Sequence, residues 1–290
     1  VSKYNKKRFD KWKTIVFQAG EAFKTQLTVN DLIQQLIDLG ADRTTVLIGI
    51  GGGVVTDITG YVASIYMRGI RFGFVPTTVL AMVDAAIGGK NGIDIGVYKN
   101  IIGIINQPDF LLYDISLLKT LPNNEWINGF AEMIKHACIK DAAMFRQLKQ
   151  HKISDYKKDA NLMNALIRRN AMIKAKVVQQ DEFEQGERRL LNFGHTFGHA
   201  IENRYGLSHG EAIAVGMVVA CVFSASLSGF KGSSQVVEMF EQYGLPTNAA
   251  FDKMEVCKIL QMDKKKERAT INYILLEKIG KGIEIGRAHV

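Results

Sequence analysis

The chain has 290 residues, of which 47% are hydrophobic and 23% are charged, and it contains only 4 prolines. This composition excludes a disordered chain, and the length suits two modest domains or one large one. The formal net charge of +8 is compatible with nucleic acid, an anionic membrane or a small anionic substrate.

The positions of the positively charged residues favour a small anionic substrate. Two short basic runs, at 6–8 and 264–266, lack interleaved aromatic residues and are typical of a solvated surface. Single cations inside apolar, glycine-rich segments are costly to bury unless an anion meets them. These cations are Arg68, Lys90, Lys99 and Lys135. We therefore expect a small, multiply charged ligand and no nucleic acid.

Cysteine spacing and apolar stretches indicate the compartment. Cys138, Cys221 and Cys257 are too far apart for a disulfide framework or a cysteine zinc site, which favours a reducing cytoplasm. Residues 1–8 lack the apolar core of a signal peptide. Residues 212–230 carry no charge, but their glycines and serines favour a buried core helix over a membrane span.

The first part of the chain alternates strand and helix patterns. We expect a helix at 30–39, a strand at 44–50, a helix at 54–66, a strand at 71–75, a helix at 77–87 and a strand at 110–113. A strand that runs through a glycine turn into a helix, followed by another strand, is typical of an open α/β sheet.

After about Leu121 the strand pattern gives way to helices. These are expected at 123–151, 158–182, 190–205 and 210–229. We therefore predict an α/β domain over residues 1–121 and a mostly α-helical domain over residues 122–290. The default place for a ligand is a cleft between two such domains.

A glycine-rich segment, Gly49 to Asp57, joins the strand at 44–50 to the helix at 54–66. Glycines at such a turn let the backbone approach a pyrophosphate, whose charge suits a helix N-terminus. The spacing is not that of the usual dinucleotide fingerprint, so a purely structural turn remains an alternative.

Three of the 6 histidines fall within a short span, in Gly-His-Thr-Phe-Gly-His and in Ser-His-Gly-Glu. His195 and His199 share one helical face, and His209 follows at a distance that allows a turn and a second helix. Imidazoles that converge in this way usually hold a divalent transition metal. The His-Glu-x-x-His arrangement of metalloproteases is absent.

Two further polar segments admit alternative interpretations. Glu132, inside an apolar helix, either pairs with Lys135 at i,i+3 or completes a Glu/His/His metal site. Arg188 and Asn192, at i,i+4 and downstream of Lys174, either belong to a solvated charged face or present donors to a carboxylate.

Taken together, these segments resemble the 3-dehydroquinate synthase family. The matching blocks are GGGVVTDITGYVASIYMRG (51–69), VPTTVLAMVDAAIGGKNGID (75–94), KNIIGIINQP (99–108), NGFAEMIKHACI (128–139), RRLLNFGHTFGHAIE (188–202) and HGEAIAVGM (209–217). They cover nearly the whole chain in the order of the family. The resemblance implies a Rossmann-like NAD-binding domain followed by a mostly α-helical metal- and substrate-binding domain.

The resemblance also implies site residues. The metal ligands, for Zn²⁺ or Co²⁺, fall on Glu132, His195 and His209. The NAD contacts fall on Glu21, Lys24, Gly51, Gly52, Gly53, Val54, Asp57, Thr77, Thr78, Lys90, Lys99 and Thr120. The catalytic and substrate-binding residues fall on Asp84, Lys90, Asn100, Lys135, Lys174, Arg188, Asn192, His199 and one of Lys264 or Lys265, with Arg68 supplied across a homodimer interface.

The implied reaction is the conversion of 3-deoxy-D-arabino-heptulosonate 7-phosphate to 3-dehydroquinate and phosphate in the shikimate pathway. It proceeds by transient NAD-linked oxidation, phosphate elimination, reduction and intramolecular aldol closure. The alternatives are a sister sugar-phosphate cyclase of the 2-deoxy-scyllo-inosose synthase type and a metal-dependent NAD dehydrogenase of the glycerol dehydrogenase type. Because family members begin with a further strand, we also expect a truncated start, which raises a third alternative, a fragment that folds without turning over.

Overall fold

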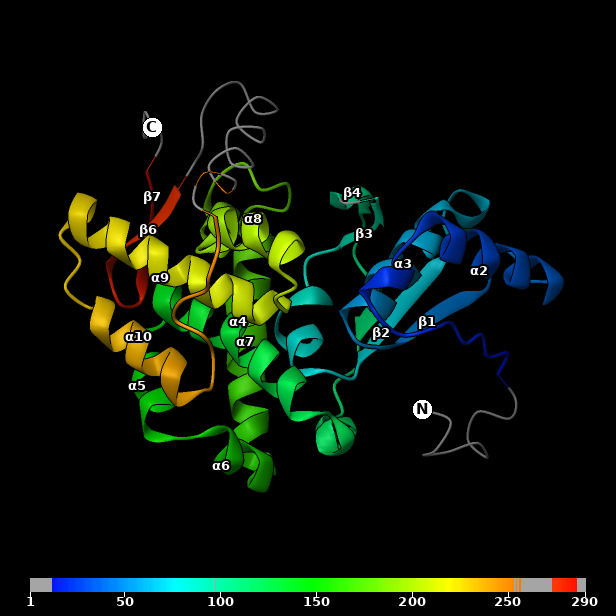
Figure 1. Ribbon diagram of the computed structural model, residues 1–290. Coiled ribbons are helices and arrows are strands. Elements are labelled where there is room, and N and C mark those ends of the chain that lie inside the picture. Colours follow the sequence, from blue (N-terminus) through cyan, green and yellow to red (C-terminus); the bar gives the residue numbers. More distant parts are fainter. Residues whose placement is uncertain (1–11, 97, 253, 255, 257–272, 286–290) are drawn as a thin grey trace. The chain divides into compact units, whose positions relative to one another are not determined.

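The computed structural model describes residues 12–96, 98–252, 254, 256 and 273–285 (Figure 1). The chain divides into two compact units, Val1–Leu118 and Lys119–Val290. The predicted roles of Lys264 and Lys265 fall outside the described residues.

The first unit is built on a parallel sheet. Strands β1 (Val46–Gly51), β2 (Arg71–Pro76) and β5 (Phe110–Leu111) lie in the order β1-β2-β5. Helix α3 (Gly53–Ile65) connects β1 to β2 and contributes Ile58 and Val62 to the core. Helix α2 (Gln26–Asp38) begins at Thr25, whose hydroxyl accepts a hydrogen bond from the Thr28 amide. Its apolar stripe packs on the same core.

The remaining elements of this unit are short. They are η1 (Glu21–Phe23), η2 (Tyr66–Arg68), η3 (Ala81–Ala85), the antiparallel pair β3 (Lys90–Ile95) and β4 (Tyr98–Ile105), and η4 (Ile115–Thr120), which continues past Leu118. The helix predicted at 77–87 is wrong in length, because only a π-helical turn with a short helical lead-in forms there. Gly88 and Gly89, with φ of 103° and 71°, turn the chain into the hairpin.

The second unit is mostly helical. Its elements are α4 (Asn123–Lys140), α5 (Ala142–Gln150), α6 (Ile153–Lys158), α7 (Ala160–Gln180), η5 (Glu187–Asn192), α8 (His195–Tyr205), α9 (His209–Ser228), α10 (Ser233–Gln242) and the hairpin β6 (Tyr273–Lys278) and β7 (Lys281–Ile285). The single helix predicted at 123–151 is wrong. Asp141 breaks it, because its carboxylate accepts the Met144 amide and so begins a new helix. The predicted fold class, an α/β part followed by a mostly helical part, is confirmed.

The uncharged stretch noted in the sequence forms helix α9. Among the described residues, this is the one helix long and apolar enough to cross a membrane by length and composition, and more than half of its most apolar window is buried. It packs against α4, α8, α10 and β6. This burial is that of a core helix, as the sequence predicted.

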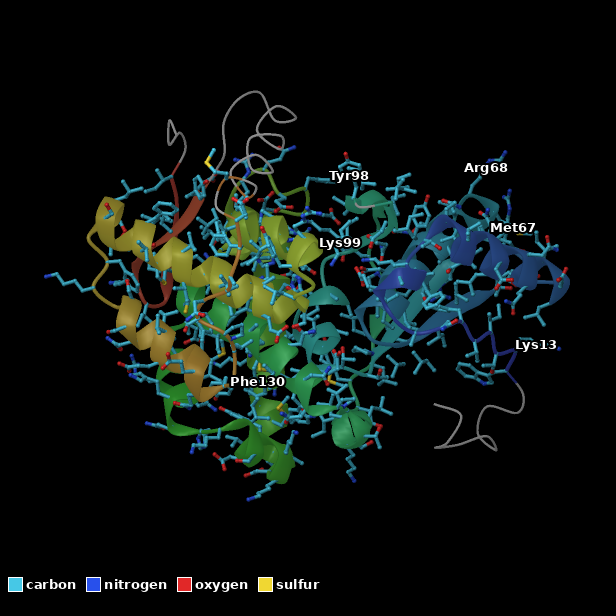
Figure 2. The ribbon with its side chains drawn as sticks, viewed as in Figure 1. Lys13, Met67, Arg68, Tyr98, Lys99 and Phe130 are labelled. Carbon is cyan, nitrogen blue, oxygen red and sulfur yellow. The ribbon has the colours of Figure 1, made fainter. Side chains whose placement is uncertain are left out.

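An aromatic cluster supports the helix that carries Glu132. Phe130 is fully buried, and its ring centroid lies 4.9 Å from that of Tyr243, 5.3 Å from that of Tyr156 and 6.5 Å from that of Trp126. Figure 2 labels Phe130 on α4. We expect Phe130→Ala to lower the free energy of unfolding by about 3–5 kcal/mol, because it removes buried apolar area and leaves a cavity. Urea denaturation followed by circular dichroism would measure this, and a loss below about 1 kcal/mol would contradict it.

Candidate metal and substrate site

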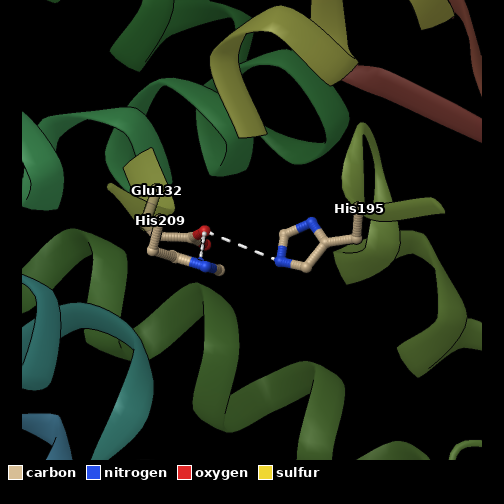
Figure 3. Close-up of side chains that lie close together, drawn as sticks. All are labelled: Glu132, His195 and His209. Carbon is tan, nitrogen blue, oxygen red and sulfur yellow. Dashed lines mark hydrogen bonds and ion pairs between the residues drawn. The ribbon is translucent and has the colours of Figure 1, made fainter. Parts of the chain in front are cut away.

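Three side chains from three helices converge in the second unit. Glu132 lies on α4, His195 begins α8 and His209 begins α9, and their possible ligand atoms all lie within 4.8 Å of one another. Glu132 Oε1 is 3.3 Å from His209 Nε2 and 3.7 Å from His195 Nε2. Figure 3 shows the two imidazole rings directed at the carboxylate.

Glycines bring these helices close enough to meet. A Cβ on Gly216 of α9 would lie 2.0 Å from the carbonyl oxygen of Gly194, the residue before α8. A Cβ on Gly210 would lie 2.8 Å from the backbone of Asn128 on α4. Since only glycine permits these approaches, the glycines around the histidines set the distances between the three helices.

The Glu132 carboxylate is fully buried and forms an ion pair with Lys135. Burial raises its pKa, but the Lys135 ammonium, the hydrogen bond to His209 and the two imidazoles outweigh burial and hold the pKa well below the ordinary value. Glu132 is therefore an anion. The same carboxylate contacts Lys135 and faces the two histidines, so the pairing with Lys135 forms and the geometry also permits a Glu/His/His metal site.

The two histidines differ in charge. Burial and the Lys135 ammonium hold the pKa of His195 well below its ordinary value. Burial also lowers the pKa of His209, but hydrogen bonds to Glu132 and Glu202 and the charges of both carboxylates raise it to about 9. In the metal-free protein His209 is therefore the more basic of the two imidazoles.

The Nδ1 atom of each imidazole, which faces away from Glu132, has a hydrogen-bond partner of its own. His195 Nδ1 lies 3.2 Å from the carbonyl oxygen of Phe193, and His209 Nδ1 lies 3.4 Å from Glu202 Oε2. Glu202 was not among the site residues predicted from the sequence. Its position seven residues after His195, on the same helical face, was the signal that would have found it.

The donor set fits a divalent transition metal. One carboxylate oxygen and two imidazole nitrogens are common zinc ligands, and two ligands of one tetrahedral zinc ion lie about 3.4 Å apart. The distances of 3.3 and 3.7 Å from Glu132 Oε1 to the two Nε2 atoms match this spacing. A metal held by these three side chains would keep a coordination position open for substrate, as catalytic rather than structural zinc sites do.

Further cationic and polar residues of the predicted substrate site lie on η5 and α7. Arg188 is buried, and its guanidinium donates to the Glu182 carbonyl while its amide donates to Asp181. Asn192 Nδ2 donates to Glu184 Oε1 at 2.6 Å. The contact between Asn192 and Glu184 was not predicted from the sequence. The backbone of Glu184 has a φ of 59°, a left-handed conformation that the sequence does not reveal. Lys174 is buried on α7, while His199 is exposed on α8 with its ring 5.2 Å from that of His195.

In the first unit, the glycine turn lies between β1 and α3, as the sequence predicted. A Cβ on Gly51 would lie 2.4 Å from the Val55 side chain, so no other residue fits without displacement. Gly52, the N-cap residue of α3, has no side chain with which to cap the helix. The first amides of the helix are therefore available to an anion. Thr78 and Ala85 line this turn, because a Cβ on Gly52 or Gly53 would approach them to 3.0 and 3.1 Å.

A buried ammonium connects several predicted cofactor and substrate residues of this unit. Lys24 Nζ lies 2.5 Å from Asp57 Oδ2, donates to Asn100 Oδ1 at 2.5 Å and is 3.9 Å from Glu21 Oε1. Burial lowers the pKa of Lys24, but Asp57 and Glu21 outweigh burial and raise it above the ordinary value. Asp94 Oδ1 accepts the backbone N–H of Asn100 at 2.7 Å and so holds β4 at this point, where Asn100 has a φ of 51°.

The other predicted residues are dispersed over short elements. Asp84 lies on η3, Lys90 begins β3, Lys99 lies on β4, Thr77 follows β2 and Thr120 ends η4. Arg68 is exposed, as Figure 2 shows, at a turn where it and Met67 both have positive φ, 67° and 49°.

Comparisons with known proteins decide the family. The family description "3-dehydroquinate synthase N-terminal" matches residues 14–128, and "3-dehydroquinate synthase C-terminal" matches residues 129–266. A 3-dehydroquinate synthase of Nitrosomonas europaea is 43% identical over 275 residues, which are 92% of this chain and 74% of that protein. The chain belongs to the 3-dehydroquinate synthase family. The resemblance stated from the sequence is confirmed.

Two solved structures of other synthases are also similar to this chain. The 2-epi-5-epi-valiolone synthase ValA from Streptomyces hygroscopicus subsp. jinggangensis 5008, with NAD⁺ and Zn²⁺ bound, has a TM-score of 0.88 and 27% identity, covering 94% of this chain and 78% of that one. A 2-deoxy-scyllo-inosose synthase complexed with carbaglucose-6-phosphate, NAD⁺ and Co²⁺ has a TM-score of 0.84 and 28% identity, covering 97% and 80%.

Proposed function

We propose that this chain catalyses the 3-dehydroquinate synthase reaction, which converts 3-deoxy-D-arabino-heptulosonate 7-phosphate to 3-dehydroquinate and phosphate. The observation that carries the proposal is the convergence of Glu132, His195 and His209 in a member of this family. The enzyme is a lyase that uses NAD and one divalent metal, as the Zn²⁺- and Co²⁺-containing relatives do. Its substrate is a small sugar phosphate.

In this proposal, Glu132 and the Nε2 atoms of His195 and His209 hold the metal. When bound, the metal polarises a substrate hydroxyl and NAD⁺ accepts and later returns a hydride. His199 takes the proton of the hydroxyl that is oxidised, since its ring lies 5.2 and 6.1 Å from those of His195 and His209 and is exposed enough to reach a ligand.

The cationic residues bind the anionic ends of the substrate. Arg188 and Asn192, four residues apart on η5, are proposed to hold the carboxylate through their N–H groups. Lys135 lies beside the metal ligand Glu132 and orients the bound hydroxyls. The substrate contacts proposed in addition are Asp84, Lys90, Asn100 and Lys174, with Arg68 reaching the site of the other subunit in a homodimer.

The cofactor is proposed to bind the first unit. The uncapped start of α3, at Gly51 to Val54, receives the pyrophosphate. Asp57 and Lys24, which form one ion pair, contact the nucleotide. The further NAD contacts proposed are Glu21, Thr77, Thr78, Lys90, Lys99 and Thr120.

The proposal also includes the compartment and the partners of the protein. We infer a cytoplasmic enzyme without nucleic-acid or membrane partners. Burial of the free thiols of Cys138 and Cys221, and burial of most of the apolar stretch of α9, support this inference. The charge of +8 then serves the capture of an anionic substrate.

A substrate comparison tests the choice of reaction. Phosphate release is measured with NAD⁺ and Zn²⁺ on 3-deoxy-D-arabino-heptulosonate 7-phosphate and on glucose 6-phosphate, which lacks the carboxylate. We expect release from the first only. Release from glucose 6-phosphate would favour a 2-deoxy-scyllo-inosose synthase, and stoichiometric accumulation of NADH at 340 nm without phosphate would favour a dehydrogenase.

A further inference from the structure

Glu202 lies at the back of the histidine cluster, on the same helix as two of its members. His195, His199 and Glu202 occupy positions i, i+4 and i+7 of α8 and therefore share one helical face. The side chain of Glu202 is 5% exposed, and its Oε2 atom lies 3.4 Å from Nδ1 of His209 on α9. A carboxylate in this position connects one proposed metal ligand to the helix that supplies another.

The chemistry of the contact fixes the state of the imidazole. An ionised carboxylate only accepts hydrogen bonds, so the proton of this contact resides on His209 Nδ1. Nε2 faces Glu132 Oε1 at 3.3 Å, and a divalent ion bound between them would take the place of a proton on Nε2. His195 is arranged in the same way by a neutral partner, because the Phe193 carbonyl at 3.2 Å from Nδ1 also only accepts.

His195 on α8 and His209 on α9 thus both present Nε2 toward Glu132 Oε1. The Nδ1 atom of each imidazole faces an acceptor, the Phe193 carbonyl for His195 and the Glu202 carboxylate for His209. Glu132 Oε1 and the two Nε2 atoms could therefore hold one divalent cation among them. A carboxylate behind an imidazole fixes its tautomer and orientation and raises its basicity as a ligand. A carbonyl fixes the orientation with less effect on basicity.

We propose that Glu202 is a positioning residue of the metal site, which holds the His209 imidazole in its Nδ1–H tautomer with Nε2 directed at the ion. The inference rests on the proposed metal site. It differs from a purely structural role, in which Glu202 would only join α8 to α9. A structural role affects the stability of the metal-free protein, whereas positioning affects the affinity of the folded protein for the metal.

The test compares four variants of the chain: Glu202→Gln, Glu202→Ala, His209→Ala and Glu241→Gln. Glu241 is an exposed carboxylate on α10 and serves as the matched control. The dissociation constant for Zn²⁺ is measured by competition with a chromophoric chelator, at a temperature where circular dichroism shows every variant folded. The thermal unfolding of each metal-free variant is recorded alongside.

We expect Glu202→Ala to weaken Zn²⁺ binding by about 10–100-fold. Glu202→Gln should weaken it less, because the amide oxygen still accepts from Nδ1 but carries no charge. Glu241→Gln should bind like the unchanged chain. If Glu202→Ala does not fold, Glu202→Gln decides the matter, with at least a threefold loss expected.

Two results would overturn the inference. If His209→Ala loses Zn²⁺ but both Glu202 variants bind within twofold of the unchanged chain, Glu202 does not position the ligand, and the metal site stands. If His209→Ala also binds normally, the metal site is wrong and the inference falls with it. A lower unfolding temperature with unchanged affinity would assign Glu202 a structural role only.

Discussion

Replacing His209 with alanine is expected to abolish stoichiometric metal binding and to lower kcat/KM for phosphate release by about three orders of magnitude. The variant removes one of three converging donors and leaves Glu132 with a single imidazole, His195, at 3.7 Å. A bound divalent ion contributes several kcal/mol of charge stabilisation, and about 4 kcal/mol corresponds to this loss of rate.

The matched control for this experiment is His151→Ala. His151 follows α5, and its ring packs against Tyr156 at 5.6 Å, away from the three converging side chains. Metal content is measured by atomic emission after gel filtration, and activity by phosphate release. Full metal content in the His209 variant, equal to that of the His151 variant, would contradict the assignment of His209 as a ligand.

Replacing Lys24 with methionine is expected to raise KM for NAD⁺ by about 10–100-fold. The ammonium of Lys24 pairs with Asp57 and donates to Asn100, both at 2.5 Å. Methionine keeps the length of the side chain but leaves two polar partners without their common donor, and the loss of a hydrogen bond to a charged group costs about 1.5–3 kcal/mol. The side chains of Asp57 and Asn100 should then lose their fixed positions.

Lys13→Met is the control for this change, because Lys13 is an exposed lysine of the same unit (Figure 2). Steady-state kinetics with varied NAD⁺ at saturating sugar phosphate separates the two variants. Since Lys24 lies in the first unit and the metal ligands in the second, Zn²⁺ content should remain unchanged in both. An unaltered KM for NAD⁺ in Lys24→Met would remove Lys24 from the proposed nucleotide site.

The sequence predicts the fold well where the periodicity of the apolar residues and the positions of the glycines indicate the same boundaries. The strand 44–50, the glycine turn and the following helix correspond to β1 and α3 within one or two residues. Where a polar residue redirects the backbone, the pattern fails. Asp141 divides one apolar periodicity into α4 and α5, because the local hydrogen bond of its carboxylate competes with helix continuation. Two hairpins, β3–β4 and β6–β7, gave no recognisable strand signal.

Local spacing predicted the candidate site only in parts, and the resemblance to the family joined these parts into one set. The spacing of His195, His199 and His209 indicated a metal site, but local spacing could not decide whether Glu132 pairs with Lys135 or faces the histidines. The answer depends on the close approach of α4 to α9 at Gly210, which is a tertiary contact. The same holds for Glu202, whose partner His209 lies on the next helix.

The most direct test of the central claim is the amount of phosphate released per NAD⁺ added. The chain is incubated with excess 3-deoxy-D-arabino-heptulosonate 7-phosphate, Zn²⁺ and NAD⁺ equimolar with enzyme, with and without EDTA. A metal-dependent cyclase that regenerates its cofactor releases many phosphates per NAD⁺, shows no lasting rise at 340 nm and stops with the chelator. Phosphate release that ends at one equivalent of NAD⁺, or that continues undiminished in EDTA, would contradict the proposed function.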